Sequence, residues 1–306
     1  MKADETAAAA TRCGFVALIG APNVGKSTLI NALVGEKVSI VSRKVQTTRA
    51  LIRGIVIEGN AQIILVDTPG IFAPKRRLDR AMVTTAWSGA HDADLVCVLV
   101  DAKLGLDAEA VAILERLAGV PHPKLLVINK IDLVAREKLL ALAKSANERM
   151  TFQHTFMISA QSGDGTEDLR KALAAMLPEG PFLYPEDQMS VAPMRHLAAE
   201  ITREKIYQQL HQELPYQSTV ETDSWTERKD NSVRIEQTIF VERESQRKIV
   251  LGKGGVTIKS IGAAARKEIA DIVGHPVHLF LFVKVRENWG DDPDRYREMG
   301  LEFPRE

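Results

Sequence analysis

The stretch Gly20-Ala21-Pro22-Asn23-Val24-Gly25-Lys26-Ser27 decides how the first half of the chain folds. It follows the apolar run 15–19 and fits the spacing G-x-x-x-x-G-K-[ST], in which a glycine-rich turn joins a strand to a helix. Glycines let the backbone N–H groups point at phosphate oxygens, and the N-terminus of the helix adds its positive dipole end. We therefore predict a phosphate-binding loop over residues 20–28, which includes Thr28. Lys26 should reach the β and γ phosphates, and the Ser27 hydroxyl should bind Mg²⁺.

Short apolar runs alternate with helical patterns on either side of this loop, at residues 15–19, 52–57, 62–66, 95–100, 125–128 and 156–158. Such runs predict a doubly wound, mostly parallel α/β sheet with crossover helices. The last helix is expected over residues 166–177, and the prolines and glycine that follow it indicate a linker. The predicted division is a flexible N-terminal extension (1–13), a nucleotide-binding domain (14–180), a linker (181–193) and a second domain with its tail (194–306).

A second motif, Asp67-Thr68-Pro69-Gly70, stands at the end of an apolar run. The carboxyl edge of a parallel sheet is where ligand-binding residues collect. Asp67 can hold a metal ion through water, and the Gly70 amide can sense the γ-phosphate. A tetrapeptide of this composition is also a common turn, so the assignment depends on its position after the phosphate loop.

The identity of the base follows from Asn129-Lys130-Ile131-Asp132, which comes directly after the run 125–128. Guanine offers two adjacent donors to a carboxylate such as Asp132, whereas adenine presents an acceptor there. Adenine would leave a buried acceptor unpaired, at a cost of about 1 to 3 kcal/mol. The motif therefore predicts GTP rather than ATP, with Ser159-Ala160 completing the pocket and the Ala160 amide facing the guanine O6.

The second domain is expected to be α+β, with the order αββααβ. The patterns predict a helix over 194–214, strands over 218–227 and 233–241, a helix interrupted by Gly252-Lys253-Gly254-Gly255, a helix over 258–272 and a strand over 277–285. The tail from Glu287 has seven acidic and three basic residues and is expected to be a solvated terminal helix.

The charge of the chain is balanced overall but not locally. Forty Lys and Arg residues face forty Asp and Glu residues, so any nucleic-acid binding must come from a local patch. Residues 243–267 are a candidate for such a patch, with seven basic residues against one acidic residue, and a solvated helix face is the alternative. The apolar runs are too short to span a bilayer. Two cysteines, Cys13 and Cys97, are too few for a disulfide framework, which favours a cytoplasmic location.

The nucleotide motifs resemble those of the translation-factor-related class of P-loop GTPases. The stretch Val45-Gln46-Thr47-Thr48-Arg49 lies where that class has its first switch. The resemblance implies Thr48 as the switch threonine on Mg²⁺, with Thr47 as the alternative, although a plain polar loop is also open. It implies Lys26, Thr48 and Gly70 as catalytic residues, and Ser27, Thr48 and Asp67 as magnesium ligands.

Position 71 is Ile, where many GTPases have the glutamine that orients the attacking water. The chain thus resembles the subgroup with a hydrophobic residue there, which implies slow intrinsic hydrolysis. Asn23 matches the asparagine that potassium-stimulated relatives use, so K⁺ is a further cofactor hypothesis beside GTP, GDP and Mg²⁺.

The loop Gly252-Lys253-Gly254-Gly255, in the order αββααβ, resembles that of a type II KH domain, which clamps the backbone of about four single-stranded nucleotides. A tight turn without a ligand is the alternative. The resemblance implies RNA contacts from these four residues, and we add Lys248 and Lys259 from the basic patch.

Together the two halves resemble the Era family of bacterial GTPases over residues 14–300. This implies a GTP-binding and GTP-hydrolysing switch that binds the 3′ end of 16S rRNA through its KH domain and assists assembly of the 30S subunit. It also implies a monomer in the cytoplasm, with peripheral association with the inner membrane. The alanine-rich extension and the Lys-Gly pair of the KH loop depart from the family pattern.

Two other functions remain open. The chain could be a regulatory GTPase that signals its nucleotide state to protein or membrane partners, in which case RNA affinity would be weak or unselective. A P-loop phosphotransferase is the other alternative, but the Asn-Lys-Ile-Asp motif and the absence of an acceptor-binding signature argue against it.

Overall fold

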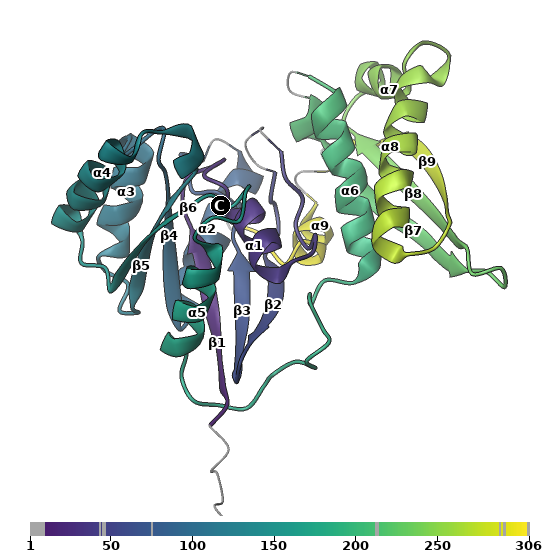
Figure 1. Ribbon diagram of the computed structural model, residues 1–306. Helices are drawn as coiled ribbons and strands as arrows, with labels where there is room; N and C mark the ends of the chain where they lie inside the picture. Colours follow the sequence, from purple (N-terminus) through teal and green to yellow (C-terminus); the bar gives the residue numbers. More distant parts are fainter. Residues whose placement is uncertain are drawn as a thin grey trace, which may run out of the picture.

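The chain folds into two bodies joined by an extended segment (Figure 1). The structure is a computed structural model, and it describes residues 10–42, 44, 47–74, 76–211, 214–287, 289 and 292–304. Residues 1–9 of the predicted N-terminal extension and residues 43, 45 and 46 near the predicted first switch lie outside these ranges. Within the described ranges, no helix is both long and apolar enough to cross a membrane.

The first body is built on a six-stranded sheet with the order β2-β3-β1-β4-β5-β6. All neighbouring pairs are parallel except β2 and β3, which form a hairpin because only Gly59 and Asn60 separate them. The doubly wound, mostly parallel sheet predicted from the sequence is confirmed. The strands are β1 (Arg12–Ile19), β2 (Ile52–Glu58), β3 (Ala61–Asp67), β4 (Leu95–Asp101), β5 (Lys124–Asn129) and β6 (His154–Ile158).

Helices cover both faces of this sheet (Figure 1). Every residue of β3 and β4 is therefore buried, which explains why residues 63–66 and 95–100 are uninterrupted apolar runs rather than alternating ones. The helices are α1 (Lys26–Val34), α2 (Arg77–Asp92), α3 (Ala108–Leu117), α4 (Arg136–Arg149) and α5 (Thr166–Met176).

The strand β1 begins inside the segment expected to be a flexible extension. Arg12 and Cys13 pair with Ala61 and Gln62 of β3, so the sheet includes residues that the sequence pattern left out. Their backbone is also held from the far end of the domain, since the Cys13 N–H donates to the Pro178 carbonyl at 3.1 Å.

The predicted linker 181–193 follows the edge of the sheet. The Ile55 N–H donates to the Met189 carbonyl at 2.8 Å, and the Val191 N–H donates to the Arg53 carbonyl at 3.2 Å. The buried Gln62 side chain donates to the Tyr184 carbonyl at 2.7 Å. These bonds fix the route by which the chain reaches the second body.

The second body has the predicted order αββααβ, with a three-stranded sheet in the order β7-β8-β9. Strands β7 and β8 are antiparallel, and β8 and β9 are parallel. The elements are α6 (Met194–Gln209), β7 (Ser218–Glu227), β8 (Val233–Val241), α7 (Glu244–Leu251), α8 (Val256–Val273) and β9 (Val277–Val285).

Two helix boundaries in this body differ from the prediction. Helix α6 ends at Gln209 rather than at residue 214, because Leu210 is already extended and Pro215 cannot continue a helix. Helix α8 begins at Val256, directly after the glycine loop, and runs to Val273.

The expectation of a solvated tail is wrong. The tail contains α9 (Pro293–Glu298), and its Trp289, Tyr296 and Leu301 side chains are buried. They form one apolar cluster with Leu78 and Met82 of α2 in the first body. The prediction considered only the charged residues of the tail and overlooked these apolar side chains. They pack the end of the chain against the first body (Figure 1).

Candidate nucleotide and RNA sites

The phosphate loop has a backbone that only glycine can adopt at its end. Gly25 has φ = 101°, and a Cβ atom there would lie 2.2 Å from Nδ2 of Asn129. Helix α1 starts at the next residue, so its free N–H groups open toward the loop. The local sequence thus places the N-terminus of α1 and the Lys26 side chain together at the end of the phosphate loop.

Lys26 is buried within this loop and is only 6% exposed. Its Nζ donates to the carbonyls of Gly20 and Ala21, both at 3.0 Å. Burial lowers the pKa of Lys26 to about 8, and the nearby Asp67 carboxylate partly opposes that shift. A cation held this way lacks a full counter-charge, which a phosphate would supply.

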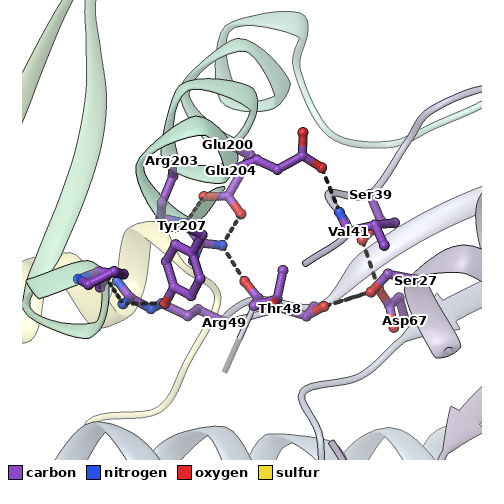
Figure 2. Close-up of polar contacts among 12 residues, drawn as sticks. Ser27, Ser39, Val41, Thr48, Arg49, Asp67, Glu200, Arg203, Glu204 and Tyr207 are labelled. Carbon is purple, nitrogen blue, oxygen red and sulfur yellow. Dashed lines mark hydrogen bonds and ion pairs between the residues drawn. The ribbon is translucent and has the colours of Figure 1, made fainter. Parts of the chain in front are cut away.

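The three predicted magnesium ligands lie together, as Figure 2 shows. The Ser27 hydroxyl donates to Asp67 Oδ2 at 2.7 Å, and its oxygen lies 2.9 Å from Thr48 Oγ1. Ser39, which sequence reasoning missed, also donates to Asp67 Oδ2 at 2.8 Å. No local motif marks Ser39.

The Asp67 carboxylate fits a metal site. It is fully buried, which raises its pKa, and among the described residues its Oδ1 has no hydrogen-bond partner. A buried carboxylate beside the hydroxyls of Ser27 and Thr48 supplies the hard oxygen donors that Mg²⁺ prefers. A magnesium ion held by these residues would also supply positive charge to balance the buried Asp67 carboxylate.

The two candidate threonines point to different places. Thr47 Oγ1 donates to the Lys44 carbonyl at 2.7 Å, whereas Thr48 Oγ1 reaches Ser27 and lies 3.4 Å from Asp67 Oδ2. The geometry therefore favours Thr48 over Thr47 as the residue near the metal.

The second motif lies against the phosphate loop. A Cβ atom on Gly70 would lie 2.9 Å from Cα of Pro22, so the Gly70 backbone is directly beside the loop. The next side chain, Ile71, is 8% exposed and belongs to the core of the first body. It offers no polar group to orient water.

The predicted base-binding residues meet at the ends of β5 and β6. Asn129 Nδ2 donates to the Val24 carbonyl at 2.8 Å, and its Oδ1 accepts the Ala160 N–H at 3.0 Å. The Ala160 amide expected to face guanine is thus already bonded to Asn129. Ser159 is buried and Asp132 is exposed to solvent.

Lys130 links the end of β4 to the phosphate loop. Its Nζ lies 2.6 Å from Asp101 Oδ2 and donates to the Asn23 carbonyl, also at 2.6 Å. Asp101 was missed from the sequence, although it ends a buried strand as Asp67 does. These bonds fasten the base side of the site to the phosphate loop.

The loop Gly252–Gly255 forms a sharp bend between α7 and α8. Gly252 has φ = 71°, and a Cβ atom there would lie 2.3 Å from Thr257 Oγ1. Lys253 and Gly254 are exposed at the tip, and Lys248 and Lys259 are exposed on the flanking helices. The six predicted RNA-binding residues therefore share one bend and its two flanking helices.

Fold and site together define a P-loop GTPase that carries a KH domain. A family described as "50S ribosome-binding GTPase" matches residues 15–130, and a family described as "KH domain" matches residues 213–290. The chain is 82% identical over 306 residues to GTPase Era of Bradyrhizobium diazoefficiens, covering 100% of this chain and 99% of the relative. It is 68% identical over 300 residues to GTPase Era of Brucella suis, covering 98% of this chain and 96% of the relative.

Two crystal structures are similar over both domains. One is Era in complex with MgGDPNP and nucleotides 1506–1542 of 16S ribosomal RNA, with a TM-score of 0.90 and 38% identity over 95% of this chain and 99% of that one. The other is a single-residue variant of Aquifex aeolicus Era bound to GDP·AlF4⁻, with a TM-score of 0.88 and 37% identity over the same shares. The chain belongs to the Era family of GTPases, and it is a GTP-hydrolysing enzyme.

Proposed function

We propose that this GTPase is a nucleotide-controlled RNA-binding switch that binds the 3′ end of 16S rRNA through its KH domain and assists assembly of the 30S subunit. The observation that supports it best is the pairing of the two sites in one chain. The similar Era structure with bound 16S rRNA nucleotides adds support for the RNA partner.

In the nucleotide site, we assign phosphate binding to the loop 20–28 and guanine binding to Asn129, Lys130, Asp132 and the Ser159-Ala160 pair. Ser27, Thr48 and Asp67 would hold Mg²⁺, which neutralises charge on the β and γ phosphates when it is bound. Lys26 donates to the same phosphates, and Gly70 reports on the γ-phosphate through its backbone N–H. Thr68 and Pro69 complete the wall beside Gly70.

In the RNA site, the bend at Gly252 and Gly255 lets a sugar-phosphate backbone approach the start of α8. Lys253 is exposed there and adds a positive charge, with Lys248 and Lys259 on either side. Apart from Gly254, its two neighbours in the chain and the adjoining backbone, no atom of the described residues lies within 4 Å of the point that a Cβ atom on Gly254 would occupy, so the tip is open. This arrangement suits backbone contacts with single-stranded RNA.

The proposal also covers a further cofactor, the oligomeric state, the location and the rate of hydrolysis. We propose K⁺ beside Asn23 as a cofactor for hydrolysis, a monomeric protein, and a cytoplasmic location with peripheral contact with the inner membrane. Slow intrinsic hydrolysis follows from the apolar Ile71 side chain.

The test is binding of a short single-stranded RNA that copies the 3′ end of 16S rRNA. The protein is loaded in turn with a non-hydrolysable GTP analogue and with GDP, and a scrambled RNA of equal length is the control. Tighter, sequence-dependent binding in the GTP-analogue state is expected, because only differential affinity can couple the two sites. Equal or absent binding in both states would favour the regulatory GTPase with protein or membrane partners.

A further inference from the structure

The switch segment (residues 37–49, of which 43, 45 and 46 are outside the described ranges) does not lie free on the GTPase domain. Its described residues contact the KH domain at several points along its length, chiefly through α6. We propose that α6 positions the switch threonine Thr48, so that the GTPase site is complete only when the KH domain is seated against it. This inference rests on the role proposed above for Thr48.

The first end of the switch segment is fixed by a carboxylate of α6. Glu204, which is 2% exposed, accepts the Val41 N–H at 2.8 Å and two hydrogen bonds from Lys37 Nζ at 2.9 and 2.8 Å. Lys37 also pairs with Glu268 of α8. Ile40, which lies between Lys37 and Val41 in the sequence, is fully buried in the apolar core of the KH domain.

The other end is fixed by two arginines, one from each domain (Figure 2). Arg203 of α6, which is 1% exposed, donates to the Thr47 carbonyl. Arg49, which is 3% exposed, donates to the Tyr207 hydroxyl at 2.9 Å and to the Ser218 carbonyl at 2.8 Å. Its guanidinium also lies 5.5 Å from the ring centroid of Trp289.

Thr48 is the residue between these two anchors. Its neighbours on both sides are bonded to the KH domain, and its side chain turns toward Ser27 and Asp67. Because buried, charge-assisted hydrogen bonds hold both neighbours, the position of Thr48 depends on α6 as well as on the nucleotide site.

The composition of α6 agrees with this role. Arg203, Glu204 and Lys205 are all buried, although a helix lying on a sheet normally turns such residues to solvent. One side of α6 packs on the KH sheet, and its charged residues meet the switch segment and α8. Arg203 and Glu204 each bond to the switch segment, whereas Lys205 pairs with Glu204 and with Glu268 of α8 inside the KH domain.

The experiment is single-turnover GTP hydrolysis by the full chain with Arg203→Ala. We expect the rate constant to fall by about tenfold or more, because displacement of a reacting group by about 1 Å can cost a hundredfold. The KM for GTP should change by less than about threefold, since the phosphate loop is untouched. The Mg²⁺ concentration needed for half-maximal hydrolysis should rise, which a general loss of stability would not cause. Arg203→Lys should restore part of the rate.

The matched control is Arg195→Ala, which removes an exposed arginine from the same helix. Arg195 donates to the Thr222 and Asp223 carbonyls, which both lie within the KH domain. Hydrolysis and Mg²⁺ dependence should stay within about twofold of wild type, because effects of surface substitutions are small.

A folded Arg203→Ala protein with wild-type hydrolysis and Mg²⁺ dependence would overturn the inference. If that variant does not fold, Lys37→Ala decides, because its side chain is 23% exposed and Glu204 keeps Lys205 as a partner. Hydrolysis slowed by about threefold with a raised Mg²⁺ requirement would support the inference, and an unchanged rate would overturn it.

Thr48→Ala separates the two levels of the proposal. If Thr48→Ala slows hydrolysis and the anchor variants do not, the role of Thr48 stands and the role of α6 falls. If Thr48→Ala has no effect, the proposed role of Thr48 itself falls.

Discussion

The molecule has two glycine loops that each open a helix, and they differ in how much of the site exists before a ligand arrives. In the phosphate loop, Lys26 is buried and already held by the carbonyls of Gly20 and Ala21. In the KH loop, Lys253 is exposed at the tip, and beyond the adjoining backbone no described atom lies within 4 Å of a Cβ position on Gly254. The first loop is preorganised for one group, whereas the second leaves its contacts to be made on binding.

This difference follows from what surrounds each loop. The phosphate loop is enclosed by β1, β4 and the Asn129 side chain, so its geometry is fixed by the core. The KH loop protrudes between α7, which ends directly before it, and α8, which begins directly after it. Preorganisation lowers the entropic cost of binding and raises specificity. Substitutions should therefore affect the two loops unequally.

Lys26→Ala should have the largest effect. Loss of two charge-assisted hydrogen bonds to phosphate, at about 1.5 to 3 kcal/mol each, lowers GTP affinity by about 3 to 6 kcal/mol, which is about a hundredfold or more. RNA binding by the nucleotide-free protein should be unchanged. Calorimetry with GTP and with RNA measures both, and Lys171→Ala, an exposed lysine of α5, is the control. Tight GTP binding by the Lys26 variant would contradict the proposed role of the loop.

The double change Lys253→Asp and Gly254→Asp tests the other loop. Two carboxylates at the exposed tip repel phosphate and remove one cation, so RNA affinity should fall by about 2 kcal/mol, or about thirtyfold. GTP affinity should not change. Arg266→Asp with Lys267→Asp, on the exposed face of α8, is the control with at least as large a change in charge. An equal loss in both double variants would mean that the net charge of the domain matters and the loop does not.

A pH series should give the smallest effect and sharpen the comparison further. The pKa of Lys26 is lowered to about 8 in the unliganded protein, and bound phosphate favours the protonated form. GTP affinity is thus greatest below pH 8 and falls as pH rises above it, by about fourfold between pH 7 and 8.5. Calorimetry in buffers of different ionisation enthalpy should show proton uptake on GTP binding at pH 8.5. A parallel decline in RNA affinity would show that the effect does not belong to Lys26.

Much of the architecture could be predicted because it depends on local sequence patterns, such as apolar runs and the spacing of motif residues. Strand ends carry Asp67 and Asn129, and the spacing of the phosphate loop places Lys26 and Ser27 at the start of a helix. These groups converge because parallel strands end at one edge of the sheet. The same reasoning failed for Ser39, which reaches Asp67 from a segment with no regular structure.

The contacts between the domains could not be predicted, because they join residues far apart in the chain. Nothing near Arg49 in the sequence indicates that Tyr207 and Ser218 would accept its hydrogen bonds. In the sequence, the charged residues of α6 resemble the solvent-exposed face of an ordinary helix, and only the structure shows that the switch segment lies beside them. Sequence patterns describe the faces of an element but not what covers them.

The docking of the tail has a consequence for how the protein is made. Trp289, Tyr296 and Leu301 are translated after β9, the last strand of the KH domain, yet they cover Leu78 and Met82 on the helix that follows Gly70. Since domains fold from the N-terminus during synthesis, the GTPase domain emerges from the ribosome with this apolar patch bare. The patch cannot be covered until Trp289 and the residues after it have been translated. Until then the patch is open to chaperones.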